Sequence, residues 1–94
     1  MKNWLYPEAI KRVEDSCNSF LSGKLQVKTL QAVLYQSEQE ILASEEKWLR
    51  SLLCEAENKL EKIIFIIPIR EQKEAVREVV FKLLSDIHKE KLHQ

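Results

Sequence analysis

The chain is short, and its composition excludes several classes of protein. It has 94 residues, of which 45% are hydrophobic and 32% charged, and its 15 basic and 15 acidic side chains give a formal net charge of zero. This size allows one domain with one hydrophobic core, and the composition is that of a globular protein. A chain with no net positive charge lacks the electrostatic basis for general nucleic-acid binding. One Gly and two Pro are too few for an all-β fold, which needs frequent turns.

The first third of the chain predicts two helices joined by a short turn. The first is expected over 7–22, because Pro7 suits a first helical turn and apolar residues then recur at helical spacing up to Leu21. Gly23 follows and can adopt the left-handed conformation that ends many helices. The second helix is expected over 27–36, where the same apolar spacing resumes.

The longest helix is predicted over 38–64, and the rest of the chain is expected to pack against it. Ser37 and Glu40 have the spacing of a capping box, in which two side chains satisfy backbone donors at the start of a helix. Apolar side chains then recur every three or four residues, and neither Gly nor Pro interrupts them. A second boundary stays open, in which the second helix continues to Ala43 and Ser44 caps the next one.

The segment from Ile63 to Ile67 is apolar on all sides and mostly β-branched, which favours a strand locally. The sequence offers no second strand to pair with it, so we interpret it as the buried end of the long helix, followed by a break at Pro68. A fourth helix is expected over 70–88. The prediction is therefore an all-α fold, a compact antiparallel four-helix bundle with one long central helix, in a single domain over 1–94.

The sequence contains no recognisable catalytic or metal-binding motif. The single Gly excludes a glycine-rich phosphate loop, and Cys17, Cys54, His88 and His93 lack the close spacing of metal ligands. We therefore expect no catalytic residue, no metal and no cofactor, and a protein that is not an enzyme. The two cysteines are far apart in a chain without an N-terminal apolar signal segment, so we predict that both are reduced, buried thiols in the cytoplasm. No apolar run is long enough to span a membrane.

The acidic residues are concentrated in the middle of the chain. Residues 31–62 carry seven acidic and four basic side chains, a net charge of −3. Carboxylates on a helix are most often simply solvated, but they also form a surface that attracts a basic partner and accelerates its association. The residues expected to contact such a partner are Glu38, Glu45, Glu46, Glu55 and Glu57.

From Ser19 to Leu25 the chain reads SFLSGKL, between two amphipathic helices and ahead of a long acidic helix. This arrangement resembles small bacterial immunity proteins of the colicin-D-like group and of contact-dependent growth inhibition systems. The resemblance covers residues 7–87 in pattern and the Phe-Leu-Ser-Gly-Lys turn in identical letters. It implies a compact helical domain that binds a cognate toxin domain and blocks its active site. We expect the chain itself to be a monomer or a weak dimer. Such toxins are often tRNA-cleaving nucleases, whose basic active-site surface an acidic helix could cover without touching nucleic acid or membrane itself.

A second function stays open. The protein could be a non-catalytic helical interaction module or a homodimer of structural role, with the apolar run Ile63–Ile69 and Tyr35 as its contact surface. A stable dimer in solution would favour this function, whereas co-purification with a toxin encoded beside it would favour the first.

Overall fold

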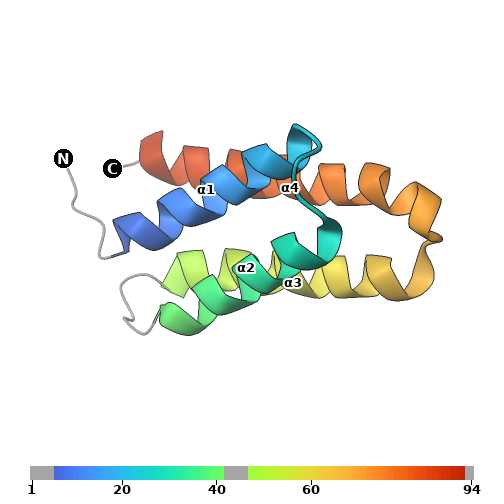
Figure 1. Ribbon diagram of the computed structural model, residues 1–94. Coiled ribbons are helices and arrows are strands. Elements are labelled where there is room, and N and C mark those ends of the chain that lie inside the picture. The colour runs from blue at the N-terminus through green and yellow to red at the C-terminus, as the bar shows by residue number, and fades with distance from the viewer. Residues whose placement is uncertain (1–5, 42–46, 93–94) are drawn as a thin grey trace.

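Four α-helices form the described part of the chain. The computed structural model describes residues 6–41 and 47–92, with side chains as far as residue 90. The helices are α1 (Pro7–Leu21), α2 (Val27–Glu40), α3 (Lys47–Ile66) and α4 (Ile69–Leu92). They run alternately up and down, and each packs on the next, while α4 also packs on α1 (Figure 1). The predicted all-α, antiparallel four-helix bundle is confirmed.

The turn between α1 and α2 forms as the sequence predicts. Gly23 has a φ angle of 80°, in the left-handed region that favours glycine. Its N–H donates to the carbonyl of Phe20 at 3.0 Å, and the N–H of Lys24 donates to the carbonyl of Ser19 at 2.9 Å. These two bonds define a Schellman motif, which satisfies carbonyl groups that the end of a helix otherwise leaves without partners.

The predicted boundary between the second and third helices is wrong. Instead of ending at residue 36, α2 continues through Ser37 to Glu40 and is followed by the extended Ile41, so residue 38 lies inside α2 and does not start the next helix, whose described bounds are Lys47–Ile66. Ser37 is fully buried inside α2, where its hydroxyl oxygen accepts hydrogen bonds from Arg12 of α1 at 3.4 and 3.3 Å. The Ser37 hydroxyl therefore bonds to another helix and does not accept the backbone N–H that a capping box requires. The alternative start at Ser44 lies outside the described residues.

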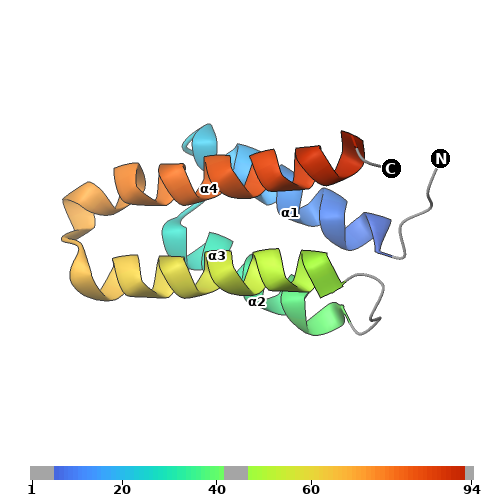
Figure 2. The same cartoon turned by 180° about the vertical axis from the view of Figure 1, so that it is seen from behind.

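The two hairpins of the bundle differ in length. Over the described residues α1 and α2 have 15 and 14 residues, whereas α3 and α4 have 20 and 24, so α4 and not α3 is the longest described helix. At about 1.5 Å per residue, α1 and α2 are roughly 10 Å shorter than their neighbours. The α3–α4 connection consequently projects beyond the α1–α2 connection, as both views show (Figures 1 and 2).

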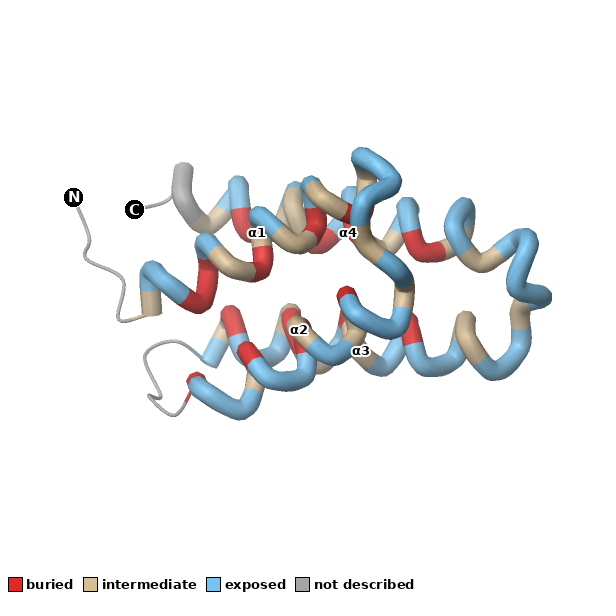
Figure 3. Tube along the Cα trace, in the orientation of Figure 1, coloured by how far each residue is buried: buried red, intermediate tan, exposed pale blue. Residues whose placement is uncertain are grey.

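The hydrophobic core lies where all four helices overlap. Every helix contributes side chains that are at most 2% exposed; the largest are Leu30, Leu34, Ile41, Leu49, Leu53, Leu60 and Ile87, with Val13, Cys17, Val76 and Val80. Toward the α3–α4 connection the chain is mostly exposed or half-buried (Figure 3). The core therefore ends well before the molecule does, and the longer hairpin continues past it.

We expect Arg12→Met to lower the free energy of unfolding by about 1–3 kcal/mol, because it removes the donors to the buried Ser37 hydroxyl and breaks the ion pair with Glu40. Lys82→Met is the matched control, since it breaks only the solvent-screened i,i+4 ion pair with Asp86 on the surface of α4 and should lower the free energy of unfolding much less. Urea denaturation followed by circular dichroism measures both variants. Equal losses would contradict a stabilising role for the Arg12 contacts.

Candidate partner-binding surface

The acidic residues predicted to bind a partner do not belong to one helix. Glu38 lies in α2, Glu55 and Glu57 lie in α3, and Glu45 and Glu46 lie outside the described residues. With its observed bounds, α3 contains four basic and three acidic side chains. The acids expected on one central helix are therefore divided, because Glu38 and Glu40 belong to α2 and Glu55, Glu57 and Glu61 belong to α3.

The two predicted contact residues of α3, Glu55 and Glu57, each have a neighbour within the chain. Glu55 pairs with Lys59 at 3.1 Å, and 57% of the Glu55 side chain stays exposed. Glu57 is half-buried and accepts a hydrogen bond at 3.3 Å from the amide of Gln31, on α2. Glu55 is thus available to a partner at the cost of a weak surface pair, whereas Glu57 also helps to hold α2 against α3.

Glu38 contacts α3 through the thiol of Cys54. The negative charge of Glu38 is the main cause that raises the pKa of this thiol above its usual value, followed by burial and by a hydrogen bond to the same carboxylate. Asn58 donates to the sulfur at 3.7 Å and acts in the opposite direction. The thiol consequently stays protonated at neutral pH, the form in which cysteine is a poor nucleophile and a poor metal ligand.

The second thiol, that of Cys17, lies in the core. Burial, and to a smaller extent the charge of Glu14, raises its pKa to about 12. Both cysteines are free thiols, as predicted, but Cys54 is only half-buried, so the expectation of two buried thiols holds for Cys17 alone. Neither provides a reactive thiolate.

Charges of both signs line the surface between α2 and α3. Glu38 and Glu55 border one shallow hollow together with Lys47 and Arg50. A basic partner that approached the carboxylates would meet these two cations as well. This surface is therefore mixed in charge and not the uniformly acidic face that the sequence suggested.

The described residues offer neither a metal site nor a membrane-spanning helix. No three His, Cys, Asp or Glu side chains among them come together in a group that could hold a metal ion. None of the described helices combines the length and the apolar character that a membrane crossing needs.

An apolar surface at the α3–α4 connection is the second candidate. Phe65, Ile66 and Ile69 are 83%, 74% and 85% exposed, and we call these three residues the apolar end. The sequence led us to expect a buried helix terminus here, which is wrong: α1 and α2 do not extend this far, and Phe65 and Ile66 lie five and six residues after Leu60, on the outer side of α3. Ile63 and Ile64, one turn earlier, are half-buried.

The apolar end is held by a side-chain cap. Pro68 separates α3 from α4, and the amide of Gln72 reaches back to donate to the carbonyl oxygens of Ile64 at 3.3 Å and Ile67 at 2.9 Å. These bonds satisfy two carbonyl groups that the end of α3 would otherwise present to water. The connection is therefore short and fixed, and it presents its apolar side chains in a defined arrangement.

Tyr35 does not belong to this surface, although the sequence suggested that it would. It is 54% exposed, in the second half of α2. That helix runs away from the α3–α4 connection (Figure 1). The structure therefore separates Tyr35 from the rest of the predicted apolar contact surface.

Charged residues flank the apolar end, in the last two turns of α3 and the first two turns of α4. We call six of them the rim; the basic members are Lys62, Arg70 and Lys73, and the acidic members are Glu61, Glu71 and Glu74. All six are exposed, and none forms an ion pair with any described residue. The apolar end thus has a border of three positive and three negative side chains, all available to a partner.

The comparisons with known proteins leave the family open: no family model, curated protein or solved structure matches the chain. The immunity-protein resemblance stays a prediction. The letters that carry it, from Ser19 to Lys24, have a local role, because they form the Schellman motif that ends α1.

We expect Gln72→Met to lower the free energy of unfolding by about 1–2 kcal/mol, because it leaves the carbonyls of Ile64 and Ile67 without their donor. Amide hydrogen exchange in the last turn of α3 should become faster. Gln36→Met is the matched control, since Gln36 is exposed and makes no hydrogen bond to a described residue; it should change stability by less than about 0.5 kcal/mol. Unchanged exchange rates at the end of α3 would show that the cap does not hold this connection.

Proposed function

We propose that the protein is a non-catalytic binding domain, and that it contacts another protein through the apolar end. The observation that carries this proposal is the exposure of Phe65, Ile66 and Ile69 at one end of the bundle. Contiguous apolar residues of this kind, bordered by polar ones, are typical of protein contact surfaces. The short chain with its free, protonated thiols is compatible with a cytoplasmic location, where thiols remain reduced.

The physical gain from covering this surface is direct. Each Å² of apolar area removed from water contributes about 25 cal/mol, and a large exposed aromatic side chain such as Phe65 offers one of the largest areas available. Since Gln72 already fixes the end of α3, little conformational freedom is lost when a partner binds. A preorganised apolar projection of this kind can provide the centre of an interface, with the rim around it.

The test compares the proteins bound by the wild type and by two variants in cells that carry the gene. The tagged wild type and Tyr35→Ser, which changes an exposed aromatic residue elsewhere, should recover the same bound protein after cross-linking. Phe65→Ser/Ile69→Ser should lose it, because both side chains belong to the apolar end. The recovered species is identified by mass spectrometry, and an untagged copy of the chain counts as a partner. If all three forms recover the same proteins, the apolar end is not the contact surface.

The immunity function is a second candidate, and one observation favours it. The side chain of Glu55, one of the predicted contact residues, is 57% exposed, and Glu38 and Glu57 are half-buried on the adjoining surfaces of α2 and α3. A nuclease toxin would present Lys and Arg around its active site, and these carboxylates could bind them by charge-assisted hydrogen bonds. Blocking the active site would then require no chemistry from this chain.

We expect Glu55→Lys/Glu57→Lys to weaken binding to a toxin domain encoded beside the gene by about 30-fold or more, a loss of about 2 kcal/mol. Glu71→Lys/Glu74→Lys, which makes the same charge change on α4, should leave the affinity within about threefold. Isothermal titration calorimetry measures both, and circular dichroism checks that each variant folds. An unchanged dissociation constant for the first variant would exclude the electrostatic form of this candidate.

A further inference from the structure

We infer that the partner of the apolar end is a second copy of this chain, and that two bundles join end to end about a two-fold axis. The inference rests on the proposed function, because it names the occupant of the same surface. It is carried by the charges around that surface, by its shape and by the area that it offers.

The charges of the rim suit a second copy better than a partner of one charge sign. The rim has three cations and three carboxylates, so a strongly acidic or basic partner would bring like charges together as often as opposite ones. In a two-fold contact, residue i of one copy faces residue j of the other, and the reverse contact follows by symmetry. A balanced rim can therefore place a cation of each copy opposite a carboxylate of the other.

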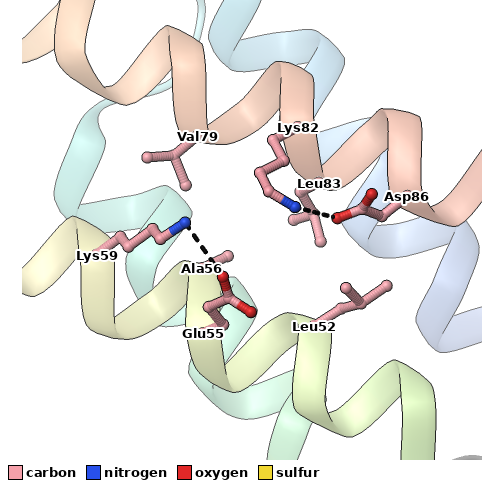
Figure 4. Close-up of a pocket in the computed structure, with 8 residues that line it drawn as sticks. All are labelled: Leu52, Glu55, Ala56, Lys59, Val79, Lys82, Leu83 and Asp86. Atoms are coloured by element: carbon pink, nitrogen blue, oxygen red, sulfur yellow. Dashed lines mark hydrogen bonds and ion pairs between the residues drawn. The ribbon is translucent and has the colours of Figure 1, made fainter.

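The availability of these charges distinguishes the rim from the middle of the same hairpin. There the ion pairs close within single helices, Glu55 with Lys59 on α3 and Lys82 with Asp86 on α4 (Figure 4). The six rim side chains form no such pair with described residues, although Arg70 and Glu74 have the spacing that would permit one. The charges next to the apolar end thus stay free for intermolecular pairing.

The shape of the surface also permits self-association. Phe65 and Ile66 border one shallow hollow, and Ile63, Ala75 and Val79 line another between α3 and α4. Lys62 borders both hollows, so the two are neighbours. Projecting apolar side chains and an adjacent apolar hollow therefore occur on one molecule, the arrangement that a self-complementary contact requires.

The available area predicts a weak dimer. Three large side chains exposing on the order of 150 Å² each give about 450 Å² per copy, or about 900 Å² for both. Stable interfaces bury roughly 1,200–2,000 Å² in total, so the apolar end needs the rim to approach that range. We therefore expect a dissociation constant on the order of 10–100 μM.

Sedimentation velocity on the purified chain, from about 1 μM to about 1 mM, tests the inference. The wild type and Tyr35→Ser should pass from monomer to dimer across this range. Ile66→Ser/Ile69→Ser should remain monomeric, and its thermal melt should match the wild type because both positions are exposed. A wild type that stays monomeric throughout, or a dimer that this variant leaves intact, would overturn the inference.

Two charge variants test the rim without knowledge of which residues face each other. Lys62→Glu/Arg70→Glu makes the rim mostly acidic, and Glu61→Lys/Glu71→Lys makes it mostly basic. Each alone should self-associate at least tenfold more weakly than the wild type, whereas an equimolar mixture should form a dimer at least as tight. Adding Ile66→Ser/Ile69→Ser to both variants should abolish the mixed dimer. A mixture that associates no better than its components would overturn the second copy as occupant.

These outcomes separate the inference from the function on which it rests. A chain that is monomeric when pure but recovers a different protein through Phe65 and Ile69 in cells would refute the second copy and support the binding function. A chain that neither self-associates nor recovers any protein through these residues would refute both.

Discussion

The unequal length of the two hairpins is the constraint on which the core and the surface both depend. A helix of 14 or 15 residues can cover only part of a neighbour of 20 or 24. Apolar side chains on the inner stripes become core within the overlap, whereas Ile63, Ile64 and Ile67, which continue the stripe of α3 beyond it, are only half-buried. Ile69 continues the stripe of Val76 and is exposed because α1 and α2 do not extend that far, whereas Phe65 and Ile66, five and six residues after Leu60, lie on the outer side of α3.

The sequence predicted the fold class correctly because its main signals are local. Apolar periodicity, the glycine at position 23 and the proline at position 68 each act within one or two helical turns, and the turns that they mark are observed. The helix boundary predicted at Ser37 was wrong because the hydrogen-bond partner of Ser37, Arg12, lies 25 residues earlier and is not visible in the local pattern. A capping motif indicates that a hydroxyl can accept a hydrogen bond from the backbone nearby. When a side chain from another helix donates to that hydroxyl, it no longer caps the helix.

The candidate site was less predictable, for two physical reasons. The predicted acidic surface assumed that acids such as Glu38 and Glu55 share one helix. Because the predicted boundary was wrong, these acids lie on different helices. Periodicity identifies the apolar face of α3, but it does not indicate whether a neighbouring helix is long enough to cover it. The relative lengths of the predicted helices, and the apolar character of 63–67 on every side, were the signals in the sequence that could have indicated an exposed end.

The up-and-down order of four helices has a consequence for any protein joined to this one. The start of α1 and the end of α4 lie at the pole opposite the α3–α4 connection (Figure 1). A fusion at either terminus would therefore leave the apolar end unobstructed. The bundle is 42 Å long, so two bundles joined at their apolar ends would form a rod about twice that length with the fused proteins at its far tips. Such a dimer would act as a spacer that keeps two attached domains apart.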